Sequence, residues 1–287
     1  MADAEQKFDA VKYKETQQDQ WNEDAAAWHR WGSTLQSWFG EVTRLMLDLG
    51  QVSPGRRILD VAAGAGQPAL SAAERVGPDG SVLATDLSAN IIRFAQQTAD
   101  ERGIGNFATR VMDGENLDLP DESFDAVLSR FGLIYMPNPQ RALSEWRRVL
   151  KPAGRVVVAA FSAPERNGWG AVPVSIIRRR AQLPPPLPGQ PGPFSLGGGG
   201  VLAGALRQAG FQEVEVRVLQ TPLRMKSAED YTRFAREAFG AFNQMMAHLS
   251  RQERESVWDE VAQAMRQFEG PKGIEAPCEP MVGVGVK

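Results

Sequence analysis

Two closely spaced glycines follow an apolar run in the segment LDVAAGAGQPAL, residues 59–70. Glycine lets the backbone adopt positive φ and approach a ligand closely. The stretch GAGQPA, which contains Gly64 and Gly66, fits the fingerprint G-x-G-x-x-G/A of dinucleotide-binding loops. The glycines therefore predict a nucleotide-like ligand, but they do not fix the charge of that ligand.

Asp60 stands four residues before Gly64. A pyrophosphate binds at the positive N-terminus of the helix that follows such a loop, and a nearby carboxylate would repel it. The sulfonium and ammonium groups of S-adenosylmethionine would instead be attracted. Asp60 therefore favours S-adenosylmethionine over a nicotinamide dinucleotide as the ligand.

Two further acids stand where an adenosine would need them. Asp86 ends the second predicted strand, twenty residues after Gly66, and is expected to accept hydrogen bonds from ribose hydroxyls. Asp113 follows the third predicted strand and is expected to face the adenine amine. The remaining candidates for cofactor binding are Ala62, Gln67, Leu87, Gly114, Glu115, Ser129 and Arg130.

Short apolar strands alternate with amphipathic helices between residues 51 and 162. Such alternation is typical of a parallel sheet covered by helices on both faces. In an open sheet of this kind, ligands bind beyond the carboxyl ends of the strands. The expected strands are 58–61, 81–85, 107–112, 124–129 and 155–161.

The segments that flank this core have different patterns. Residues 1–50 predict a helical lid, because their tryptophans and other apolar residues recur at helical spacing. Residues 163–200 are rich in proline and glycine and predict an extended, mobile segment. The remaining expected parts are a core helix and strand (201–222), a helical substrate cap (223–272) and a terminal strand (273–287).

The core motifs resemble those of class I S-adenosylmethionine-dependent methyltransferases. They are ILDVAAGAG, ATDLS, MDGENLDLP, FDAVLSRFGL and RVLKPAGRVVVAAFS, of which the last is similar to the ubiquinone/menaquinone methyltransferase-like group. The resemblance implies a Rossmann-like α/β fold whose seven-stranded, mostly parallel sheet has an antiparallel last strand, here MVGVGVK. Ile134-Tyr135 stands where the quinone-type enzymes have Arg-Asn, so quinone methylation is not implied.

The sequence contains fewer motifs that indicate how the methyl acceptor binds. Tyr135 and His29 are the candidate catalytic residues, since a general base would assist methylation of a hydroxyl or an acidic carbon. The candidate substrate-contacting residues are Trp28, Trp31, Tyr135, Trp169, Phe239, Phe242 and Met246. Packing within helices is the alternative role for these aromatic and sulfur-containing side chains.

The amino-acid composition limits the kinds of partner that we expect the chain to bind. The net charge is −3, which disfavours a nucleic-acid partner. One cysteine and two histidines predict neither an internal disulfide nor a metal site. The N-terminus has no apolar run, so we expect no membrane partner and a cytoplasmic location, with the chain a monomer or homodimer.

Three functions are open at this point. The first is methyl transfer from S-adenosylmethionine, an EC 2.1.1 type reaction, to an O, N or C atom of a small, largely apolar or aromatic metabolite. The second is an NAD(P)-dependent oxidoreductase that uses the glycine loop, although the chain shows no Tyr-x-x-x-Lys motif. The third is a non-catalytic protein that binds S-adenosylmethionine.

Overall fold

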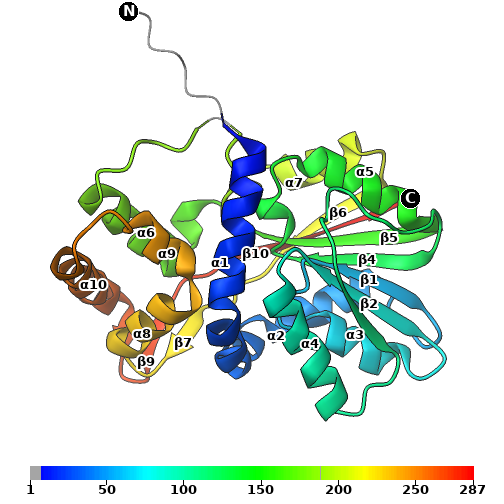
Figure 1. Cartoon of the computed structure of the whole chain (residues 1–287), viewed down its shortest axis with the longest axis horizontal. Helices are drawn as coiled ribbons and strands as arrows, with labels where there is room; N and C mark the ends of the chain where they lie inside the picture. The colour runs from blue at the N-terminus through cyan, green and yellow to red at the C-terminus, as the bar shows by residue number, and fades with distance from the viewer. Residues whose placement is uncertain (1–7, 188) are drawn as a thin grey trace, which may run out of the picture.

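A seven-stranded sheet forms the centre of the molecule in the computed structural model, which describes residues 8–187 and 189–287 (Figure 1). The strand order is β3-β2-β1-β4-β5-β10-β6. The strands are β1 (Arg57–Val61), β2 (Ser81–Asp86), β3 (Phe107–Val111), β4 (Phe124–Arg130), β5 (Leu150–Phe161), β6 (Gln212–Val218) and β10 (Pro280–Val286). Only β10 runs antiparallel to its neighbours among these described pairings, so the predicted fold class is confirmed.

Helices cover both faces of this sheet. Figure 1 shows α5 (Pro139–Val149) and α7 (Val201–Gln208) on one face. The other face carries α2 (Gly32–Leu49), α3 (Ala69–Val76) and α4 (Ala89–Glu101). Two of these helices have side-chain caps at their N-termini: Ser88 accepts from the Ile91 N–H and Asn138 from the Arg141 N–H. The cap at Ser88 starts α4 directly after the end of β2, whereas the turn η1 separates β4 from the start of α5.

A second group of elements lies beside the sheet. It comprises α6 (Gly168–Arg180), α8 (Ala228–Ala238), α9 (Gly240–Met245), α10 (Arg251–Met265) and a sheet of β7 (Leu223–Met225), β9 (Gly273–Ala276) and β8 (Glu269–Gly270). The long helix α1 (Ala10–Arg30) runs between this group and the main sheet (Figure 1). Short 3-10 turns lie at η1 (Leu133–Tyr135), η2 (Pro164–Arg166) and η3 (Arg266–Phe268).

Two boundaries differ from the sequence expectation. Residues 168–180, expected as part of an extended segment, form the helix α6, whose face of Trp169, Ile176 and Ile177 is buried. The proline-rich stretch that follows dominated the composition and hid this periodicity. Residues 273–276, expected in the terminal strand, instead form β9, which pairs with β7 of the small sheet.

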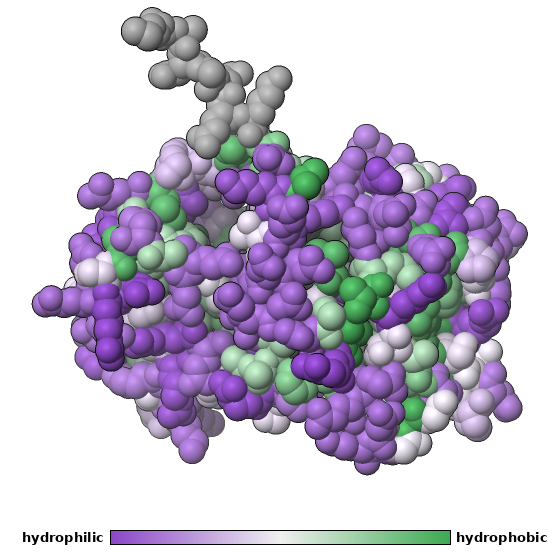
Figure 2. All heavy atoms as spheres, in the orientation of Figure 1, coloured by the Kyte–Doolittle hydropathy of each residue, from purple (hydrophilic) through white to green (hydrophobic). Residues whose placement is uncertain are grey.

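Polar side chains predominate on the face of the molecule seen in Figure 2, with apolar side chains gathered in smaller patches. Among the described residues, no helix combines the length and the apolar character needed to cross a bilayer. The buried core runs through the central strands, where Ile58, Leu59 and Leu128 are fully enclosed.

Candidate active site

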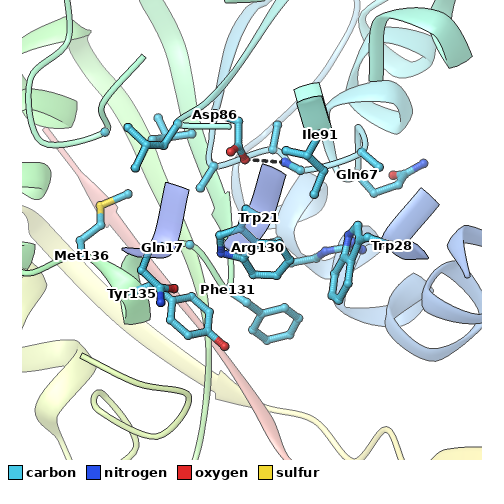
Figure 3. A pocket seen from close by; sticks show the side chains of 18 of the residues that line it. Gln17, Trp21, Trp28, Gln67, Asp86, Ile91, Arg130, Phe131, Tyr135 and Met136 are labelled. Atoms are coloured by element: carbon cyan, nitrogen blue, oxygen red, sulfur yellow. Dashed lines mark hydrogen bonds between the residues drawn. The ribbon is translucent and has the colours of Figure 1, made fainter. Parts of the chain in front are cut away.

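A cavity opens at the carboxyl ends of β1 to β4, between the sheet and helix α1 (Figure 3). It encloses about 1430 Å³ of space between atoms, part of which is open to solvent. Of the residues predicted from the sequence, those that line it are Ala62, Gly64, Gln67, Asp86, Leu87, Asp113, Gly114, Arg130, Trp28, Tyr135, Trp169 and Phe239. The strand ends therefore bring most of the predicted site together.

The glycine loop turns under this cavity with several residues at positive φ. Ala62 has φ 58°, Gly64 has φ 56° and Gly66 has φ 110°. Gly64 lines the cavity, whereas Gly66 does not, because it packs against α3 and α4. A Cβ at Gly66 would lie 2.7 Å from a side-chain carbon of Leu70. The first glycine thus gives access to a ligand, and the second permits close helix packing.

Asp86 ends β2 and fixes the loop. One carboxylate oxygen accepts from the Gly64 N–H at 2.9 Å and the other from the Ser88 N–H at 2.9 Å. Burial raises the pKa of Asp86, while these N–H donors act to lower it. Its carboxylate lines the cavity, with lone pairs left to accept from a ligand.

Asp113 follows β3 and is held by a lysine from α1. Lys14 Nζ lies 2.7 Å from Asp113 Oδ2 and 2.7 Å from Glu115 Oε2. Asp113 Oδ1 also accepts from the Glu115 N–H at 2.9 Å. Glu115 itself lies outside the cavity lining, since its other oxygen accepts from the Asn138 N–H. Helix α1 is therefore fastened directly to the acids at the β3 end of the cavity.

Asp60, the acid expected to attract the cationic part of the ligand, is not among the residues that line the cavity. The residue is 0% exposed and its Oδ2 accepts from the Ala69 N–H at 3.0 Å, which ties β1 to the start of α3. Burial raises the pKa of Asp60 to about 8, with Arg130 and the Ala69 N–H opposing this shift. The Asp60 carboxylate thus stabilises the glycine loop by holding the start of α3 against β1.

Arg130, at the end of β4, brings a guanidinium to the cavity. It donates to Thr43 Oγ1 at 2.9 Å and lies 5.7 Å from the centre of the Phe39 ring. Burial lowers the pKa of Arg130 to about 10, and the charge of Asp60 opposes that shift. Within the described residues Arg130 forms no ion pair, and the acid whose charge acts on it is the buried Asp60.

Eight aromatic rings close the other side of the cavity, and we call them the aromatic half. They are Trp21, Trp28, Phe39, Phe131, Tyr135, Phe161, Trp169 and Phe239. Phe131 and Phe161 stack with ring centres 4.2 Å apart, and Trp28 packs edge-on against Phe239 at 6.0 Å. In the view of Figure 3, Asp86 lies opposite the rings of Tyr135 and Phe131. The cavity thus has a polar half and an aromatic half.

Several predicted site residues lie elsewhere. His29 stacks on Phe94, with ring centres 4.5 Å apart, and does not line the cavity. Trp31 donates from Nε1 to Glu237 at 2.9 Å. Ser129, on β4, is fully buried beneath the close approach of Gly132. The expectation that these three side chains meet a ligand is not met, because each is engaged in packing.

Phe242 and Met246 likewise pack inside the cap. Phe242 contacts the rings of Phe239 and Trp258, with centres 5.5 Å and 6.3 Å apart, and Met246 is 0% exposed. Neither lines the cavity. Their apolar spacing indicated a buried helix face, and the sequence did not distinguish the cap's core from a substrate surface.

The comparisons with known proteins agree on one family. Residues 59–158 match the model of a methyltransferase domain. Nocamycin O-methyltransferase from Saccharothrix syringae is 34% identical over 206 residues, which are 69% of this chain and 74% of that relative. The chain belongs to the S-adenosylmethionine-dependent methyltransferases.

Other relatives of this methyltransferase are similar over shorter stretches. A ubiquinone/menaquinone biosynthesis C-methyltransferase from Bordetella avium is 41% identical over 111 residues, 39% of this chain and 43% of that relative. The solved phosphoethanolamine N-methyltransferase 2 of Haemonchus contortus, in complex with S-adenosyl-L-methionine, has a TM-score of 0.53 at 18% identity, covering 90% of this chain and 52% of that one. The structural likeness shows the shared fold.

The cofactor of the methyltransferase is S-adenosylmethionine, with S-adenosylhomocysteine as its product. The residues present fit this molecule, because Asp86 offers a carboxylate beside the glycine loop and Gly64, at φ 56°, brings its backbone to the cavity. A Cβ at Gly64 would lie in van der Waals contact with Trp28 Nε1, 3.6 Å away, so the indole of Trp28 lies over the loop. The cavity therefore has a wall of backbone on one side and an indole on the other.

Several residues of the methyltransferase cavity carry no signal that sequence reasoning could have used. Lys14, Gln17, Gln36 and Met136 line it, yet none stands in a motif or follows a predicted strand directly. Phe39 has the helical spacing of a buried helix face, and a residue on such a face can equally line a cavity. The path of α1 and α2 across the strand ends brings Lys14, Gln17 and Gln36 to the site, and the turn η1 brings Met136.

Proposed function

We propose that this methyltransferase transfers a methyl group to a small, largely apolar or aromatic acceptor. The observation that carries the proposal is the aromatic half, which lies in the same cavity as the glycine loop and Asp86. Aromatic side chains with a few polar groups are typical of small-molecule sites.

The polar half is proposed to hold the cofactor. Asp86 would accept hydrogen bonds from the ribose hydroxyls, and Asp113 from the adenine amine. The backbone of Ala62 and Gly64 would lie against the methionine part, beside Gln67, and Arg130 would pair with its carboxylate. The cavity lining supports each of these roles by position, since the acids follow β2 and β3 and the arginine ends β4.

The protein's task in the reaction is alignment and exclusion of water. Bound S-adenosylmethionine supplies an electrophilic methyl group on a sulfonium. Holding the acceptor in line with that methyl lowers the barrier by roughly 7–11 kcal/mol in favourable cases. The rings of Trp28 and Phe239 meet over the cavity and would exclude solvent from it.

We infer O-methylation as the transfer type, because the relative that covers most of this chain is named an O-methyltransferase. Similarity to a C-methyltransferase is confined to 39% of this chain. C-methylation is therefore the second candidate.

A screen with methyl-labelled S-adenosylmethionine tests the proposal. The purified chain is incubated with fractions of small hydrophobic metabolites, and the products are identified by mass spectrometry. We expect labelled product and one S-adenosylhomocysteine for each methyl group transferred. Tight S-adenosylhomocysteine binding without turnover on any fraction would favour the non-catalytic alternative. Binding of NADH alone would favour the oxidoreductase.

A further inference from the structure

The ionisable groups of the cavity are divided unequally between its two halves. The lining carboxylates, Asp86 and Asp113, follow β2 and β3, and strand β1 separates them from β4. Both are engaged: Asp86 by two N–H donors, Asp113 by Lys14. Beyond β1, the ionisable side chains among the described lining residues are Arg130 and Tyr135. No described lining residue is a histidine, a glutamate or a cysteine.

Tyr135 is suited to donate a hydrogen bond rather than to remove a proton. Burial raises its pKa to about 12, so the phenol is neutral at physiological pH. Its hydroxyl points away from Asp86 (Figure 3). Its described neighbours include Tyr13 of α1, whose pKa it helps to raise, and the ring of Trp21. Gln17 of α1 also lines the cavity and lies beside Tyr135 in the view of Figure 3. None of them is a base.

A general base must lie within hydrogen-bond reach of the proton that it removes. The aromatic half offers the hydroxyl of Tyr135 as a donor but, among its described residues, no such base. We propose that the acceptor binds as an oxygen acid already ionised in solution, a carboxylate or acidic enolate on an apolar body, and that Tyr135 donates a hydrogen bond to it. This inference rests on the proposed function and names its substrate class.

The charge balance of the transfer agrees with this class. The acceptor oxygen anion donates an electron pair to the methyl carbon, and an O–C bond forms. The S–C bond breaks, its electron pair stays on sulfur, and a neutral thioether leaves. No proton is released, so no base is needed. The negative charge of the acceptor oxygen and the positive charge of the sulfonium disappear in the same step. An apolar site with little water favours this neutralisation over a step that separates charges.

Binding of three matched probes tests the proposal without turnover. The probes are 2-naphthoate, neutral 2-naphthamide and the 2-naphthylmethylammonium ion, titrated by calorimetry into the chain saturated with S-adenosylhomocysteine. We expect naphthoate to bind at least about tenfold more tightly than either other probe. Equal or tighter binding of the amide or the cation overturns the proposal, and so does the absence of naphthoate binding.

The first titration, with S-adenosylhomocysteine alone, separates two kinds of failure. If it does not bind, the proposed function fails. If it binds and the anion is not preferred, only the present inference fails.

Two variants isolate the role of Tyr135. Tyr135→Phe removes one hydroxyl, and we expect naphthoate affinity to fall by about three- to tenfold while naphthamide affinity changes less than twofold, as for loss of a charge-assisted hydrogen bond. His29→Gln is the matched control, because His29 stacks on Phe94 outside the cavity, and it should leave both affinities unchanged. An unchanged ratio in Tyr135→Phe overturns the assignment of Tyr135.

Discussion

The position of Asp60 in the sequence indicated the cofactor, but the side chain of Asp60 does not line the cavity. Its place before the glycine loop indicated the right cofactor, yet its side chain is buried behind the loop and accepts from the Ala69 N–H. The sequence carries no information on which side of a strand end an acid points when both faces of the sheet are covered. Asp86 and Asp113, which follow their strands, do line the cavity.

The buried Asp60 predicts a pH dependence of stability. Its folded pKa of about 8 lies above the unfolded value of about 3.9, so the folded state binds the proton more tightly. The stabilisation from this group is complete below about pH 4 and is lost as pH rises to about 8. Asp60→Asn keeps an oxygen for the Ala69 N–H but cannot titrate.

Denaturant unfolding at a series of pH values measures this effect. The difference in unfolding free energy, wild type minus Asp60→Asn, should fall between pH 4 and pH 8. Arg130 and Asp86 interact with this carboxyl, so they must be unchanged in the wild type and in Asp60→Asn alike. Parallel curves over this range would show that Asp60 does not titrate as described.

At the level of elements, the central sheet was predictable and its surroundings were not. Apolar strands that alternate with amphipathic helices leave few other packings, and the boundaries of β1 to β4 agree with expectation to within one residue. The exception is β5, which begins at Leu150 because the segment expected as a turn before residue 155 continues the strand. The small sheet of β7, β8 and β9 joins segments 223–225 and 269–276, which are distant in the sequence and too short to show a clear alternation. Helix α6 was hidden by its Pro/Gly-rich neighbour.

Helix α1 was predicted, but its contacts with the strand ends were not. Its polar residues reach the loops that bear the cofactor candidates: Lys14 meets Asp113, Gln18 donates to the Leu87 carbonyl and Asn22 accepts from Ser88. Its tryptophans Trp21 and Trp28 belong to the aromatic half. Opening of α1 would thus break polar contacts and expose the cavity at the same time.

Lys14→Met should loosen this helix. The ion pairs of Lys14 are partly shielded from solvent. With about 1 kcal/mol, the upper value for exposed pairs, amide hydrogen exchange in α1 should accelerate by about fivefold. The control is Lys12→Met on the same helix, where the exposed Lys12 makes no side-chain contact among the described ion pairs. Mass spectrometry of deuterium uptake reports both. Equal uptake in the two variants would show that Lys14 does not fasten α1.

At the scale of the whole molecule, the cavity is completed only where three parts meet. The sheet provides the loops, α1 provides a cover and the cap provides Phe239 against Trp28. Trp31 bonds to Glu237 at the same junction, and Asp24 lies against Gly240 at the start of α9. Residues of α1 and of the cap, which are far apart in the sequence, thereby line one site. Figure 1 shows α1 between the cap and the main sheet.

The most direct test of this account is calorimetric titration of the purified chain with S-adenosylhomocysteine. We predict binding at one site per chain, and no heat with NADH. Asp86→Asn should weaken that binding about tenfold or more, as for a lost charge-assisted hydrogen bond. Asp118→Ala, at an exposed residue paired with Arg110, should leave it unchanged. Absence of binding, or equal affinity in Asp86→Asn, would contradict the site described here.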